Sequence, residues 1–111
     1  MELTWTEFEK ADMRVGTIIA VNDFPEARKP AYQLTIDFGS EIGVKKSSAQ
    51  ITKRYQKEEL LNRQIIAVVN FPKKQIGKFM SECLVLGAVG TAGDVILLAP
   101  DFKVGNGLRI G

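Results

Sequence analysis

Residues 67–87 read AVVNFPKKQIGKFMSECLVLG, and this stretch decides the fold. It joins two apolar runs, at 65–69 and 83–86, whose length and branched side chains are typical of buried strands. Pro72 cannot donate to a strand ladder and restricts Phe71 to an extended conformation, so the first strand should end there. The connector mixes lysines with large apolar side chains. It indicates either a binding surface or an apolar end of the core that lysines keep soluble.

Length and composition predict one globular domain over residues 1–111. Apolar residues make up 45% of the chain and charged residues 25%, which is ordinary for a soluble protein. No run approaches the roughly 18–20 apolar residues that cross a bilayer. The acidic N-terminus, MELTWTEFEKAD, is unlike a signal peptide. We therefore expect a cytoplasmic protein without membrane insertion.

The residue types argue against an enzyme. The chain has no histidine, which removes the commonest general base and the nucleophile systems that depend on it. The only cysteine, Cys83, lies inside an apolar run, so we expect a buried thiol and no internal disulfide. The serines and carboxylates have no base, metal cluster or phosphate loop beside them. We expect no catalytic residue, no metal and no cofactor.

The net charge of +2 conceals a basic middle. Residues 28–78 contain eleven Lys or Arg and four Asp or Glu, whereas the rest of the chain contains four and nine. Such asymmetry favours phosphate-rich or acidic partners if the charges cluster in space. If they do not cluster, they form an ordinary solvated surface.

The N-terminus has the signals of a short helix. Thr4 and Glu7 have capping-box spacing, and Leu3 and Phe8 are placed as a hydrophobic staple. A helix of two turns is too short to be stable alone, so its apolar side chains should pack on the body or on a second copy. We expect dimer contacts at Leu3, Trp5 and Phe8.

Short strands should make up most of the remaining chain. We expect them at 13–21, 32–38, 41–46, 65–69, 83–86 and 95–98, with a final edge strand after Asn106-Gly107. Gly16 indicates a bulge or a bend in the first. A helix should occupy 51–61, and Ser47 and Gln50 fit its capping box. Alternatively, Lys45, Lys46, Ser48 and Gln50 present donors to an anionic ligand.

This pattern predicts an all-β protein, a five-stranded OB-fold barrel with a short N-terminal helix and a helix between strands 3 and 4. In that fold, the loops between strands 1 and 2 and between strands 4 and 5 flank the binding face. Here these loops are residues 22–30 and 70–81. Both mix basic and aromatic residues.

Several motifs resemble the CsaA secretion chaperones. They are DMRVGTI at 12–18, PEARKPAY at 25–32, IDFG at 36–39, SSAQIT at 47–52, VNFP at 69–72 and SECLVLG at 81–87. The resemblance runs from about Phe8 to the C-terminus. CsaA proteins in turn resemble the tRNA-binding domain appended to some methionyl- and tyrosyl-tRNA synthetases.

The resemblance implies a single tRNA-binding-type OB-fold domain that forms a homodimer through its N- and C-terminal segments. It implies binding of unfolded or precursor polypeptides, with the export machinery as a further partner, and no catalysis. It also implies tRNA as an alternative ligand. The connector 71–77, FPKKQIG, is more apolar and less charged than in the tRNA-binding relatives, which favours the chaperone.

Two sets of candidate contacts follow. The polypeptide set consists of apolar side chains in or beside the two loops: Phe24, Pro25, Phe71, Pro72, Ile76, Phe79 and Met80. The RNA set consists of basic and polar side chains: Arg28, Lys29, Lys45, Lys46, Ser48, Gln50, Asn70, Lys73, Lys74, Lys78, Ser81 and Glu82.

Overall fold

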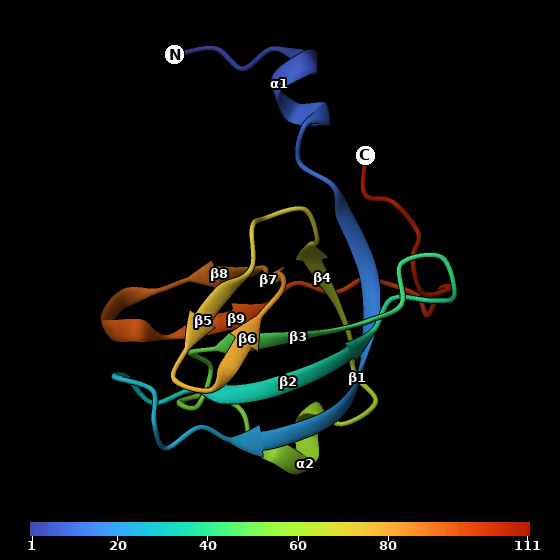
Figure 1. Cartoon of the computed structure of the whole chain (residues 1–111). Coiled ribbons are helices and arrows are strands. Elements are labelled where there is room, and N and C mark those ends of the chain that lie inside the picture. The colour runs from blue at the N-terminus through green and yellow to red at the C-terminus, as the bar shows by residue number, and fades with distance from the viewer.

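The computed structural model describes residues 1–111 as a curled sheet with small appendages (Figure 1). The sheet has the order β3-β2-β1-β4-β7, and every neighbouring pair is antiparallel. This five-stranded OB-fold barrel confirms the predicted fold class. No helix is long and apolar enough to span a membrane. The bounds of the sheet strands are β1 Met13–Asp23, β2 Tyr32–Asp37, β3 Val44–Ala49, β4 Gln64–Val68 and β7 Leu84–Val85.

Two hairpins and three short helical segments complete the chain. One hairpin lies inside the predicted connector, which was expected to be a loop, and the other follows β7. The hairpin strands are β5 Lys74–Ile76, β6 Phe79–Ser81, β8 Gly87–Val89 and β9 Val95–Leu97, and the helices are α1 Trp5–Glu9, α2 Lys57–Leu60 and the 3-10 turn η1 Thr91–Gly93.

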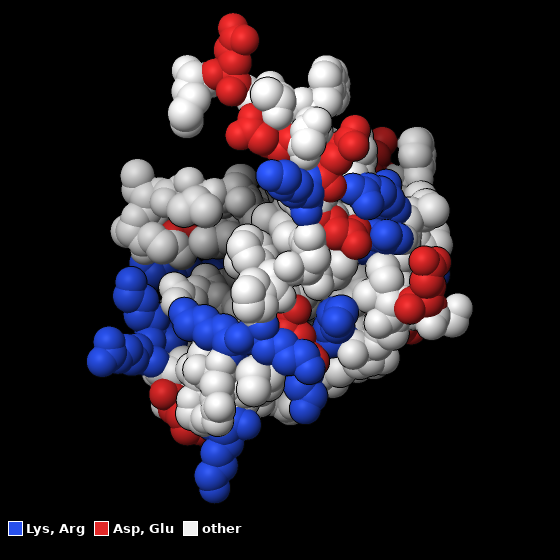
Figure 2. Space-filling view, turned by 45° about the horizontal axis from the view of Figure 1, so that its top comes forward, with Lys and Arg blue, Asp and Glu red and all other residues white.

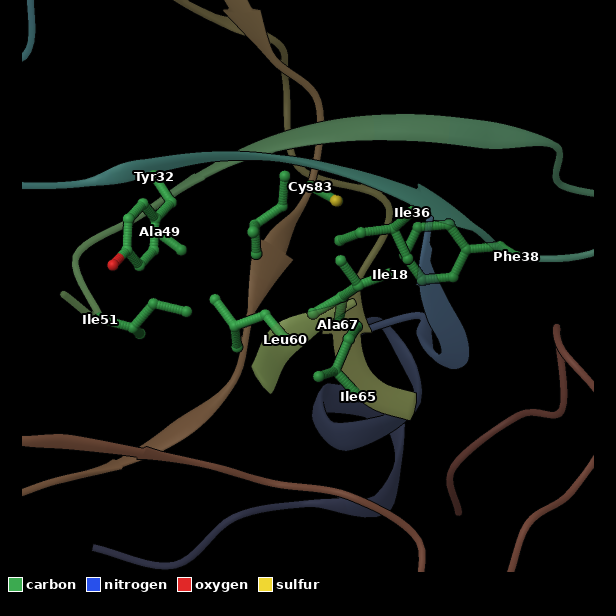
Figure 3. Close-up of a cluster of buried hydrophobic side chains, with 11 residues drawn as sticks. Ile18, Tyr32, Ile36, Phe38, Ala49, Ile51, Leu60, Ile65, Ala67 and Cys83 are labelled. Carbon is green, nitrogen blue, oxygen red and sulfur yellow. The ribbon is translucent and has the colours of Figure 1, made fainter. Parts of the chain in front are cut away.

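The core fills the concave side of the sheet (Figure 3). Alternate residues of β2 are buried, as its apolar–polar alternation predicts. Ile18 of β1 and Ile65 and Ala67 of β4 belong to the same buried cluster. The eleven members are Ile18, Tyr32, Leu34, Ile36, Phe38, Ala49, Ile51, Leu60, Ile65, Ala67 and Cys83.

Gly16 allows the close approach of β1 and β2. A Cβ atom at this position would lie 2.6 Å from Ile36 Cγ2 and 2.7 Å from Phe38 Cδ1. The bulge that the sequence placed at Gly16 lies instead between Ile18 and Ala20, where the register with β2 shifts. The glycine therefore serves packing, and of the predicted bulge or bend the structure contradicts the bulge at this residue.

The predicted helix entry at Ser47 is also wrong. Ser47 lies in β3, fully buried, and its Oγ donates to the Cys83 carbonyl oxygen at 3.0 Å. The helix between strands 3 and 4 begins only at Lys57, where the Glu59 carboxylate accepts from Gln56 N at 2.8 Å. Residues 52–54 form a turn, and Ile51 and Tyr55 on either side of it pack in or against the core.

The N- and C-terminal segments lie on the same side of the barrel (Figure 1). At the N-terminus the capping box is present, with Glu7 N donating to Thr4 Oγ1 at 3.1 Å and Thr4 N donating to Glu7 Oε1 at 3.0 Å. The C-terminal segment pairs with β1, because Val15 N donates to Leu108 O at 3.0 Å and Ile110 N to Met13 O at 2.9 Å. The C-terminal segment thus lies along β1 as predicted, but it forms an isolated bridge between Arg14 and Arg109 and not a strand.

Candidate functional site

A continuous groove crosses the barrel beside the β5–β6 hairpin. It consists of three hollows of about 230, 380 and 480 Å³. Neighbouring hollows share lining residues, and Lys74 lines all three. We use the name groove for these hollows, which are lined by Glu26, Ala27, Arg28, Lys29, Ala31, Ser48, Ala49, Gln50, Ile51, Phe71, Pro72, Lys74, Gln75, Ile76, Gly77, Ser81, Cys83, Leu84, Val85, Gly87, Val89, Val95 and Leu97.

The hairpin puts alternate residues on opposite faces. Lys74 pairs with Ser81 and Ile76 with Phe79, whereas Gln75 pairs with Met80. Phe79 is buried and Met80 is 39% exposed, which identifies the inner and outer faces. The inner face therefore carries Lys74 and Ser81 into the groove.

A small apolar cluster fastens the hairpin to the loop between β1 and β2. Phe24 and Phe79 are 4% and 9% exposed, and their ring centroids lie 5.2 Å apart. Ala31 completes the cluster and Ile76 packs against it. The prediction that Phe24 and Phe79 offer apolar surface to a polypeptide is therefore wrong. Because the rings pack on each other, these two residues position the groove and do not line it.

Other apolar candidates are open to solvent. Phe71 is 54% exposed and lines the smallest hollow together with Pro72. Pro25 is exposed on the loop after β1. Met80 lies on the outer face of the hairpin. Of the predicted apolar contacts, the structure thus brings Phe71, Pro72 and half-buried Ile76 to the groove.

Sequence reasoning missed most of the groove floor. Its central hollow is lined mainly by hydrophobic residues, and Leu84 is 47% exposed there. These residues come from β7, β8 and β9. The apolar runs at 83–86 and 95–98 were a signal, but such runs predict a buried strand as readily as an open floor. The missed floor residues are Cys83, Leu84, Val85, Val89, Val95 and Leu97.

Ser81 and Glu82 close the barrel against β3. Ser48 N donates to Ser81 Oγ at 3.2 Å, and Lys46 N donates to Glu82 Oε1 at 3.0 Å. Glu82 N donates to Lys46 O at 2.7 Å, and Lys73 Nζ lies 3.7 Å from Glu82 Oε2. Both side chains were predicted RNA contacts. In the structure they accept hydrogen bonds from backbone N–H groups at the edge of β3.

Asn70 links the barrel to the segment after α1. Its Nδ2 donates to Lys10 O at 2.7 Å, and its Oδ1 accepts from Asp12 N at 3.0 Å. Both ends of the amide are therefore occupied within the chain. Asn70 is not among the residues that line the groove.

The predicted basic contacts divide into several groups. Arg28, Lys29 and Lys74 line the groove with Ser48 and Gln50. The alternation of β3 places Lys45 on the core-facing side with Ser47, whereas Lys46 faces the other way. Lys78 is exposed at the hairpin turn.

Figure 2 shows Lys and Arg gathered across the middle and lower left of one face, with Asp and Glu gathered around the N-terminal helix. Of the basic middle of the sequence, Arg28, Lys29 and Lys74 line one hollow together. A clustered positive field attracts anionic partners.

Polar contacts of Lys53 and Arg54 hold the β8–β9 hairpin, which contributes to the groove floor. We call these contacts the clip. Arg54 Nε and Nη2 donate to the Asp94 carboxylate at 2.6 and 3.0 Å, and Lys53 Nζ donates to Ala92 O. The hydrogen bonds from Arg54 lower the pKa of Asp94 and, reciprocally, raise the pKa of Arg54.

Cys83 lies at the groove floor but is only 7% exposed. Burial raises the pKa of the thiol to about 12, so the thiol is protonated at neutral pH and is not a nucleophile. This confirms the predicted buried thiol.

Comparison with known proteins identifies the family of this chain. Residues 13–109 match the family described as "Putative tRNA binding domain". The chain belongs to this tRNA-binding domain family. Among solved structures, the chaperone CsaA from Bacillus anthracis is 51% identical with a TM-score of 0.94, and each chain is covered completely. The CsaA chaperone protein from Picrophilus torridus is 56% identical with a TM-score of 0.92, over 99% of this chain and 100% of that one.

Other members of the tRNA-binding domain family are parts of larger proteins. The methionine–tRNA ligase of Pyrococcus furiosus is 36% identical over 108 residues, which are 97% of this chain and 14% of the ligase. The chain thus spans about one seventh of the curated relatives it matches. The matching part is the non-catalytic domain. The comparisons confirm the resemblance to CsaA chaperones and support a binding domain of the chaperone or tRNA-binding kind.

Proposed function

We propose that this chain is a non-catalytic, homodimeric chaperone that binds apolar segments of unfolded or precursor polypeptides in the groove. The observation that carries the proposal is a row of exposed apolar side chains along the groove, namely Phe71, Leu84 and Val89. They lie beside half-buried Val85, Val95 and Leu97. Soluble proteins bury such surface unless it binds a partner. The likeness to two CsaA chaperones over essentially the whole chain supports the same conclusion.

Polar groups beside the floor suit a polypeptide ligand. A peptide site needs apolar surface for side chains and a few polar groups that orient the backbone. Ser48, Gln50 and Lys74 line the central hollow next to the floor residues. None of the five ion pairs of the chain involves Lys74, so its ammonium group is free to meet a ligand.

The test removes apolar surface without disturbing the core. A Phe71→Ser, Leu84→Ser double variant changes two side chains that are about half exposed and line the groove. We expect it to lose suppression of citrate synthase aggregation, measured by light scattering, and to keep its circular dichroism spectrum. Val44→Ser is the matched control, because Val44 is 54% exposed on β3 and does not line the groove. Undiminished protection by the double variant would refute the proposal.

The dimer part of the proposal rests on α1. None of its residues is buried, and Leu3 and Trp5 are 69% and 81% exposed. A hollow of about 390 Å³ lies between these side chains, Phe8 and the terminal Gly111. A five-residue helix with such an exposed apolar face needs a covering partner. We therefore assign Leu3, Trp5 and Phe8 to the contact with a second copy.

A second candidate function is tRNA binding, favoured by the clustered positive charge and by the family match. Lys and Arg would contact phosphates, and exposed Phe71 is available for base stacking. A gel-shift titration with tRNA across 50–200 mM salt tests it. Several phosphate contacts would weaken binding by about 10³-fold or more over this range. An absence of binding at low salt would exclude it.

A further inference from the structure

Strand β5 has an unpaired edge. It belongs to a two-stranded sheet in which its only partner is β6. Outside that ladder, none of the backbone hydrogen bonds of the chain involves residues 74–76. The backbone groups of β5 that point away from β6 therefore meet solvent.

The hairpin turn identifies which residue presents these groups. Ile76 pairs with Phe79 across a two-residue loop, and the first loop residue, Gly77, has a φ of 61°. The second loop residue, Lys78, has no positive φ, so the turn is of type II′ and is flanked by a hydrogen-bonded pair. Hydrogen-bonded and non-hydrogen-bonded pairs alternate along an antiparallel ladder. The N–H and C=O of Gln75 therefore both point toward the free edge.

This edge opens into the groove. Residues 74–77 line the hollow of about 480 Å³, and residues 26–29 of the β1–β2 loop line the same hollow. The buried Phe24–Phe79 pair holds the loop and the hairpin at a fixed separation beneath it. The hollow has a volume within the range of ligand sites.

Charge determines what can pair with this edge. Lys73, Lys74 and Lys78 oppose pairing of two β5 strands, because both copies of the hairpin would carry the same positive charge. Arg28 and Lys29 add positive charge across the hollow, and Glu26 is its only carboxylate. The edge is therefore open to a neutral or acidic extended segment and closed to a second copy of itself.

We propose that an extended segment of the bound polypeptide adds to β5 as a further strand, with hydrogen bonds to the Gln75 N–H and C=O. The inference rests on the proposed chaperone function and gives its mode of recognition. Backbone pairing is independent of client sequence, whereas Lys74 and Ile76 on either side of Gln75 select neutral or acidic apolar segments. A chaperone with many clients needs this combination.

The first test follows the Gln75 amide by hydrogen exchange. The probe is a blocked nine-residue peptide of alternating leucine and serine with one central aspartate. We expect the Gln75 amide to exchange freely in the unbound dimer and to gain at least about ten-fold protection at saturating peptide, since a backbone hydrogen bond forms there. Saturation without protection of Gln75 would overturn strand addition and leave the proposed function standing.

The second test removes one backbone donor of β5, and a control variant accounts for the loss of the side chain. Gln75→Pro removes the outward N–H, which β6 does not use, and proline is accommodated at such edge positions. We expect about ten-fold weaker peptide binding by calorimetry, the equivalent of about one to two hydrogen bonds. Gln75→Ala keeps the N–H and should bind as the parent does. Equal binding by both variants would overturn the inference.

Peptide chemistry provides a check that does not depend on the fold of a variant. Two probe peptides are N-methylated at alternate residues, one set odd and one set even. Pairing along one edge requires one set to bind at least about ten-fold more weakly than the other, and equal affinities would overturn it. If neither the probe nor reduced α-lactalbumin binds while tRNA does, the proposed chaperone function itself fails.

Discussion

Replacing Phe79 with alanine should release the β5–β6 hairpin from the β1–β2 loop. Phe79 is 9% exposed and packs on Phe24, so the change opens a cavity in a cluster with only three buried members. Removal of a buried phenylalanine side chain costs about 3–5 kcal/mol. We expect about 3 kcal/mol here, because the small cluster can collapse partly into the space. With a urea dependence of about 1–3 kcal/mol/M, the unfolding midpoint should fall by about 1–3 M.

The adjacent residue supplies the control. Met80 is on the same strand but on the outer face and is 39% exposed, so Met80→Ala should change stability by less than about 0.5 kcal/mol. Urea unfolding followed by circular dichroism compares the two variants, and citrate synthase protection should fall for Phe79→Ala alone. If both midpoints move equally, the cluster does not hold the hairpin and the placement of the groove wall is wrong.

Three further predictions concern the dimer, the clip and RNA. Trp5 is the only tryptophan, so its fluorescence emission should be blue-shifted in the dimer; emission like that of free indole at every protein concentration would contradict the assignment. Because Arg54 lowers the pKa of Asp94, the clip should be intact above about pH 4 and lost as pH falls through the lowered pKa. Protection of the Gly90 amide should show this step, and Asp94→Asn should remove it. Lys74→Ala should reduce the salt slope of tRNA binding by about one; an unchanged slope would place phosphates elsewhere.

The polypeptide and RNA interpretations converge on the same groove. Lys74 lines all three hollows of the groove, and the donors Ser48 and Gln50 lie beside its apolar floor. An anionic backbone and an extended apolar chain would thus compete for one surface. The difference lies in what each ligand needs, because RNA requires positive charge and stacking whereas a polypeptide requires the floor.

The sequence by itself determined the barrel and its N-terminal cap. Alternation in β2, the capping box at Thr4 and Glu7, and the apolar runs on either side of the connector are local patterns, and each is present in the structure. These patterns depend on neighbours in the chain, so they can be read from one sequence. The absence of histidine likewise excludes catalysis that depends on a histidine base.

Only the tertiary structure decided which side chains the site exposes. Phe24 and Phe71 are both phenylalanines that precede a proline in a loop. Phe24 is nevertheless 4% exposed, whereas Phe71 is 54% exposed. The difference arises because Phe24 meets Phe79, which lies far away in the chain. The local sequence predicts Ser47 as a helix cap. In the structure Ser47 pairs with Leu34 of β2 and is fully buried. Burial and edge pairing are long-range properties, so the floor of the groove and the free edge of β5 required the fold.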